Sequence, residues 1–145
     1  MLLIELVNNL VKKYKTNNPI ELAGYLNINI LFEELGTING YYNTVFRSKF
    51  IHINSSLEEY KQKFTIAHEL GHAILHPKAN TPFLRENTLF SIDKLEKEAN
   101  LFAVNLIISD DDLKEYKEFT INQLSSVFGI HEKLIELRLR QVKYQ

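Results

Sequence analysis

The chain has 145 residues, a net charge of −1 and no cysteine. These values exclude a disulfide framework, a thiolate metal site and a strong overall field for nucleic acid or anionic membranes. The length and the hydrophobic share of 45% predict one globular domain over residues 1–145. Because the first residues lack a signal-peptide pattern and no apolar run approaches about 20 residues, we expect a cytoplasmic protein with no membrane span.

Two helices and a small sheet are predicted for the first part of the chain. Apolar residues at helical spacing indicate a helix over 2–15, and Asn18 with Pro19 begins a second helix over 19–26. Alternating residues predict three strands, at 28–33, 38–46 and 49–53. We expect these strands to form a small antiparallel sheet.

The rest of the chain is predicted to be mainly helical. Ser56 and Glu59 have the spacing of a capping box that opens a helix over 57–76, and Pro77 ends it. An irregular loop over 77–90 follows. The helices expected after it cover 92–107, a short segment from Ser109, a segment from Thr120 to Gly129, and 131–142. The fold class is therefore α+β, with a helix-turn-helix-like C-terminal hairpin over 119–142.

The helix over 57–76 contains the pattern His-Glu-x-x-His. Four residues of a helix advance about 6 Å and turn about 400°, so His68 and His72 lie one turn apart on nearly the same face. Two imidazoles placed in this way can bind one Zn²⁺ ion. Glu69 flanks the metal-binding face, where a general base acting on water is needed. The pattern therefore predicts a zinc peptidase site in which Glu69 is catalytic.

A catalytic zinc site needs a third protein ligand and an open position. His76 lies about 12 Å from His68 along the helix axis, which is too far for one ion. A site completed by a glutamate from a second helix resembles that of thermolysin-like zinc peptidases, and here the helix over 92–107 offers Glu96 and Glu98. The apolar stripe of that helix comprises Leu95, Ala99, Phe102 and Leu106. We favour Glu98 because it borders this stripe, whereas we expect Glu96 to project away from it.

Two motifs together resemble the ImmA/IrrE family of zinc metallopeptidases. The first runs from Phe64 to His72, and the second runs from Glu98 to Ala103. Similarity at Pro19–Ala23 and at Ile51–Asn54 extends the resemblance over most of the chain. The resemblance implies a minimal thermolysin-like core in which Zn²⁺ is the cofactor.

The resemblance also implies roles for particular residues. It makes His68, His72 and Glu98 the metal ligands and Glu69 the catalytic residue. Family members relieve repression by cleaving helix-turn-helix regulators of phages or mobile elements. We therefore expect an endopeptidase with low basal activity whose substrate is one specific cytoplasmic protein, namely such a repressor.

The sequence leaves two features open: the residue that stabilises the oxyanion and the element that binds the substrate. A hydrogen-bond donor usually helps to stabilise the oxyanion, and the candidates are Tyr41, Tyr42, His52 and His76. The strand that precedes the motif helix is a candidate for binding an extended substrate by β-addition.

Two other functions fit parts of the sequence. The C-terminal hairpin would suit a DNA-binding module, since Arg138, Arg140 and Lys143 follow its turn. However, Glu132 and Glu136 would repel phosphate from the would-be recognition helix, so we do not expect direct nucleic-acid binding. The other alternative is a catalytically silent zinc protein that acts by binding its regulator. A site of two histidines and a glutamate also accepts other first-row ions.

Overall fold

The computed structural model describes residues 2–78 and 91–141 of the chain. Within these residues the helices are α1 (Leu3–Tyr14), α2 (Pro19–Tyr25), α3 (Glu59–Leu75), α5 (Ser91–Ile107), α6 (Asp110–Glu115), α7 (Ile121–Phe128) and α8 (Glu132–Leu139). The strands are β1 (Ile28–Glu33), β2 (Gly40–Val45) and β3 (Ser48–Asn54). The predicted α+β class is confirmed, whereas most of the loop expected over 77–90 lies outside the described residues. None of the helices described has the length and apolar character needed to cross a bilayer.

The sheet is mixed and has the order β1-β3-β2, so the expected antiparallel sheet is wrong for one of its two pairings. β2 and β3 form an antiparallel hairpin whose turn contains Phe46 and Arg47, both at positive φ. The hairpin leaves one edge of β3 open, and β1 joins that edge in the parallel direction, with Ile30 opposite Ile51. The strand before the motif helix is therefore the central strand. Since both its edges are paired, this strand does not offer the open edge that the hypothesis of β-addition requires.

Most helix ends follow their sequence signals. The side chain of Asn18 accepts hydrogen bonds at the start of α2. Thr120 and Gln123 form a capping box at the start of α7, and Gly129 ends this helix in the left-handed conformation with φ 66°. In each case a local side chain or glycine satisfies backbone groups that the helix itself leaves unpaired.

The start of the motif helix α3 differs from the prediction. α3 begins at Glu59, and no side chain caps it. Instead of capping the helix, the hydroxyl of Ser56 donates a hydrogen bond to Glu34, which follows β1. The Ser56 N–H donates to Asn54 Oδ1 at 3.0 Å, which shapes the turn between β3 and α3. The predicted capping box at Ser56 is wrong because this serine ties the turn to the sheet.

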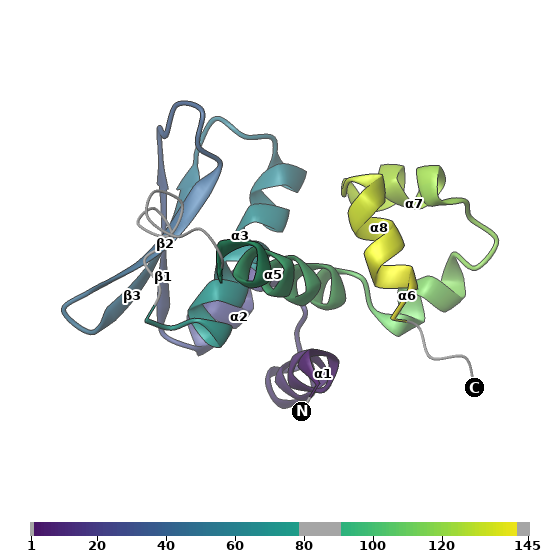
Figure 1. Ribbon diagram of the computed structural model, residues 1–145, viewed down its shortest axis with the longest axis horizontal. Helices are drawn as coiled ribbons and strands as arrows, with labels where there is room; N and C mark the ends of the chain where they lie inside the picture. The colour runs from purple at the N-terminus through teal and green to yellow at the C-terminus, as the bar shows by residue number, and fades with distance from the viewer. Residues whose placement is uncertain (1, 79–90, 142–145) are drawn as a thin grey trace.

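The motif helix α3 lies between the sheet and α5 (Figure 1). It contacts β2 and β3 on one side and α5 on the other, while α1 and α8 pack against other parts of α5. As a result, every residue from Thr65 to Ala73 is buried, polar and apolar alike. Buried polar groups are costly unless they are paired. The arrangement of the fold therefore requires partners for the histidines and the glutamate of the motif.

Close packing of α3 on α5 depends on Gly71. A Cβ atom at this position would lie 3.1 Å from Phe102 Cβ and 3.2 Å from Ala99 Cα. We expect Gly71→Ala to lower the free energy of unfolding by about 1 kcal/mol, because the strain of overpacking exceeds the gain in helix propensity. Urea unfolding of the metal-free protein measures this change.

The matched control for Gly71→Ala is the same substitution at Gly24, in α2. A Cβ at Gly24 would meet nothing within 4 Å. Gly24→Ala should therefore raise the free energy of unfolding by about 0.5–1 kcal/mol, since the unfolded chain loses conformational freedom. Equal effects of the two substitutions would contradict the role of Gly71 in bringing the helices together.

The C-terminal hairpin of α7 and α8 is fastened to the junction of α5 and α6 by Arg138. This side chain is buried, its Nε donates to the Ile108 carbonyl at 2.9 Å, and its guanidinium pairs with Asp110 at 2.7 Å. Arg138 is one of the three basic residues of the hairpin region that would suit contact with nucleic acid. In the structure the contacts with Ile108 and Asp110 engage its guanidinium within the protein.

Candidate metal and catalytic site

The two motif histidines meet one carboxylate from α5. His68 Nε2 and His72 Nε2 each lie 2.9 Å from an oxygen of Glu96. Each of the three side chains offers one ligand atom, and these atoms lie within 4.8 Å of one another. Two imidazoles and one carboxylate, with a fourth position left for water or substrate, make up a donor set typical of catalytic zinc sites. These residues could therefore hold a divalent metal ion.

Glu98, the residue favoured from the sequence as the third ligand, does not join this cluster. Its Oε1 lies instead 3.2 Å from His76 Nε2. Residues two positions apart leave a helix about 200° apart around its axis, so Glu96 and Glu98 cannot both face the motif histidines. The structure makes Glu96 the candidate third ligand in place of Glu98. The expectation that Glu96 projects away from the contact between the helices is corrected accordingly.

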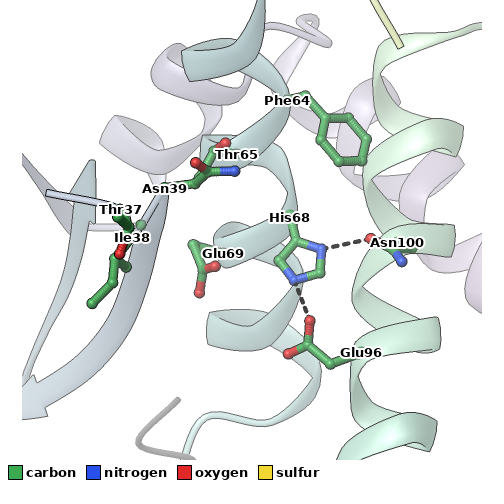
Figure 2. A pocket seen from close by; sticks show the side chains of 10 residues that line it. Thr37, Ile38, Asn39, Phe64, Thr65, His68, Glu69, Glu96 and Asn100 are labelled. Carbon is green, nitrogen blue, oxygen red and sulfur yellow. Dashed lines mark hydrogen bonds and ion pairs between the residues drawn. The ribbon is translucent and has the colours of Figure 1, made fainter. Parts of the chain in front are cut away.

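Asn100 is a site residue that the sequence analysis missed. It lies one turn after Glu96 on α5, and its Oδ1 is 2.8 Å from His68 Nδ1 (Figure 2). Asn100 and Glu96 therefore hold the two nitrogens of one imidazole. The available signal was the spacing of four residues between Glu96 and Asn100, which is the same as that between His68 and His72. Two pairs with this spacing, one on each of two packed helices, can therefore lie opposite each other and come into contact.

Charge is concentrated in this cluster. Burial alone would raise the pKa of Glu96, but hydrogen bonds from His68 and His72 lower that pKa well below its ordinary value. Burial also opposes the charged form of His68, yet the hydrogen bond to Glu96 and the charge of Glu69 raise the pKa of His68. The metal-free site thus favours a proton on His68 beside an ionised carboxylate. A metal ion bound through His68 Nε2 would displace that proton.

Glu69 lies next to the cluster, at the wall of a cavity of about 440 Å³. The cavity is bounded by α3, α5 and the segment that leads into β2. Figure 2 shows the Glu69 carboxylate between the ring of His68 and residues Thr37 and Ile38 of that segment. The predicted catalytic residue therefore lies where it can reach a water molecule or a substrate held beside the candidate metal ligands.

The four donors considered for the oxyanion are not among the described residues that line this cavity. Tyr41 stacks on His52 with ring centres 4.2 Å apart, and both side chains lie on the sheet face opposite the one that buries Ile51. Tyr42 is buried and donates its hydroxyl proton to the carbonyl of Pro77 at 2.7 Å. The fourth candidate, His76, lies just after α3 and contacts His72 from outside the cavity.

A second hollow, of about 790 Å³, adjoins the first. It runs between the first half of α3 and the α7–α8 turn, and shares Asn39, Phe64 and Thr65 with the first cavity. Val127 and Leu134 add apolar surface to its wall. The opening at the candidate metal site therefore continues along the protein toward the C-terminal hairpin.

The chain is similar to known peptidases over most of its length. Residues 23–140 match the IrrE N-terminal-like domain, family M78 of the peptidases. "Uncharacterized immunity region protein 2" of Bacillus phage phi105 is 49% identical over 135 residues, which cover 91% of this chain and 85% of that protein. Metallopeptidase ImmA of Bacillus subtilis (strain 168) is 34% identical over 142 residues, which cover 94% of this chain and 83% of that protein.

A solved structure shares the fold. A Mycobacterium tuberculosis transcriptional regulator aligns with a TM-score of 0.64 at 15% identity. The alignment covers 98% of this chain but 47% of the other, so the chain corresponds to about half of that protein. At this identity the likeness concerns the fold alone.

Proposed function

Because the chain belongs to the family of IrrE N-terminal-like peptidases, we propose that it is a zinc-dependent endopeptidase. The observation that carries this proposal is the contact of Glu96 with both motif histidines beside the buried Glu69. A solvated pair of histidines would need no such partner. The arrangement instead combines a metal donor set with a carboxylate suited to proton transfer.

In the proposed mechanism each residue of the cluster has a distinct task. His68, His72 and Glu96 hold the metal, which when bound supplies Lewis-acid activation of water and of the scissile carbonyl. Asn100 accepts the Nδ1 proton of His68 and so directs Nε2 toward the metal position. Glu69 accepts a proton from the attacking water and transfers it to the leaving amine.

We infer that the substrate is a cytoplasmic protein, a helix-turn-helix repressor of a phage or mobile element. The relative from Bacillus phage phi105 carries the name of an immunity region, and another relative is named metallopeptidase ImmA. The two adjoining hollows support a polypeptide substrate, since together they extend from the metal cluster to the α7–α8 turn. Phe64 borders both hollows, so a chain bound at Glu69 would pass over this ring.

Cleavage of a repressor by the purified protein tests this function. The zinc-loaded protein should convert a candidate helix-turn-helix repressor into two fragments, which intact-mass measurement identifies. EDTA should stop the reaction and added zinc should restore it, because the proposed chemistry needs the metal. A repressor that stays intact in this assay, although co-expression of the two proteins relieves repression, would instead indicate regulation by binding alone.

A further inference from the structure

We propose that His76 and Glu98 form a relay that positions His72 as a metal ligand; the inference rests on the proposed metal site. His76 Nδ1 lies 3.0 Å from His72 Nδ1, and His76 Nε2 lies 3.2 Å from Glu98 Oε1. On its other side, His72 Nε2 contacts Glu96. The four side chains therefore form one continuous chain of polar contacts from α5 through the end of α3 and back to α5.

The direction of each hydrogen bond in this relay follows from the ligand role of His72. A histidine that binds a metal through Nε2 carries its proton on Nδ1. The Nδ1–H of His72 must then donate to His76 Nδ1, which has to be the unprotonated nitrogen. A neutral His76 therefore carries its proton on Nε2 and donates it to the carboxylate of Glu98. Glu98 thus selects the tautomer of His76 that can accept from His72.

The relay gives His72 the same support that Asn100 gives His68. In both cases an acceptor holds the Nδ1 proton and leaves Nε2 directed at the metal position. Partners of this kind fix the orientation of a ligand ring and strengthen metal binding. The difference is that Asn100 acts directly from α5, whereas His76 directly follows the last residue of α3 and needs Glu98 to hold its ring.

The end of α3 is held firmly enough for such a relay. The backbone N–H of His76 donates to the His72 carbonyl at 2.7 Å. Lys49 Nζ donates to the Ala73 carbonyl at 3.1 Å, and the hydroxyl of Tyr42 binds the residue that follows His76. Side chains from β2 and β3 therefore place the backbone of His76, and the remaining freedom is rotation of its ring. Glu98 removes that freedom.

Zinc affinity, measured by competition with a chromophoric chelator, tests the relay. His76→Leu removes the acceptor and should weaken zinc binding by about 10–100-fold, the usual effect of losing a partner of a ligand histidine. His76→Gln retains an acceptor oxygen and should recover most of this loss. Glu98→Ala should weaken binding less than His76→Leu does. In a protein that already carries His76→Leu it should have no further effect, because Glu98 acts through His76.

Two controls separate the relay from general effects. Glu118→Ala removes one negative charge at an exposed position and should leave zinc affinity unchanged. Urea unfolding of the metal-free variants should show that each is folded. Any decrease in the free energy of unfolding should be too small to account for the loss of zinc affinity. The relay alone would be overturned by either of two results. One is a wild-type zinc affinity in folded His76→Leu protein; the other is an undiminished effect of Glu98→Ala on zinc affinity in a protein that already carries His76→Leu. Wild-type protein that binds no zinc would overturn the proposed function as well.

Discussion

Glu69→Gln is expected to lower the rate of repressor cleavage by about 10²–10⁴-fold, the usual contribution of a general base. Glutamine preserves the shape of the side chain in its buried position but cannot accept the proton of the attacking water. The metal ligands are untouched, so zinc content and affinity should remain close to those of the wild type. Cleavage rates under single-turnover conditions, measured with zinc-loaded protein, give the size of the effect.

The matched control for this prediction is Glu59→Gln, the same change at an exposed position of the same helix. It should leave the cleavage rate within about twofold, as is usual for surface positions. If Glu69→Gln cleaves at the wild-type rate while it retains zinc, Glu69 is not the base. If the variant instead loses zinc, its slow cleavage would reflect the metal site and not proton transfer.

The sequence predicts the motif helix well because its signals are local. The spacing of His68 and His72 fixes their common face in any helix, and Glu69 follows from its place between them. The structure shows that all three residues are buried and that the two histidines contact α5 through Glu96. The capping signals at Asn18 and Thr120 are equally local and are confirmed.

Long-range features are harder to predict, as the sheet and the third ligand show. The pairing of β1 with β3 depends on which edge of a hairpin is open, and the alternation within a strand carries no information on this. Glu96 and Glu98 lie on opposite flanks of the apolar stripe of α5, so hydrophobic periodicity separates them only weakly. In the structure the flank that carries Glu96 faces the histidines, while Ala99 and Phe102 of α5 pack against Gly71.

Glu96→Gln and Glu98→Gln are expected to have very different effects on zinc binding. Glu96→Gln removes the anionic ligand and should weaken zinc binding by more than about 100-fold, because the loss of an outer partner alone costs about 10–100-fold. Glu98→Gln keeps an oxygen that can accept from His76, so its effect should stay within about tenfold. Competition with a chelator measures both affinities under the same conditions.

This pair of variants is a matched comparison, since both remove one charge from the same helix two residues apart. A general effect of charge would therefore weaken binding equally in the two proteins. The opposite ranking, with zinc lost in Glu98→Gln and retained in Glu96→Gln, would support the ligand favoured by the sequence and contradict the geometry of the structure. The expected ranking follows from helix phase: only the flank of α5 that carries Glu96 and Asn100 contacts His68, and a carboxylate 200° away cannot replace it.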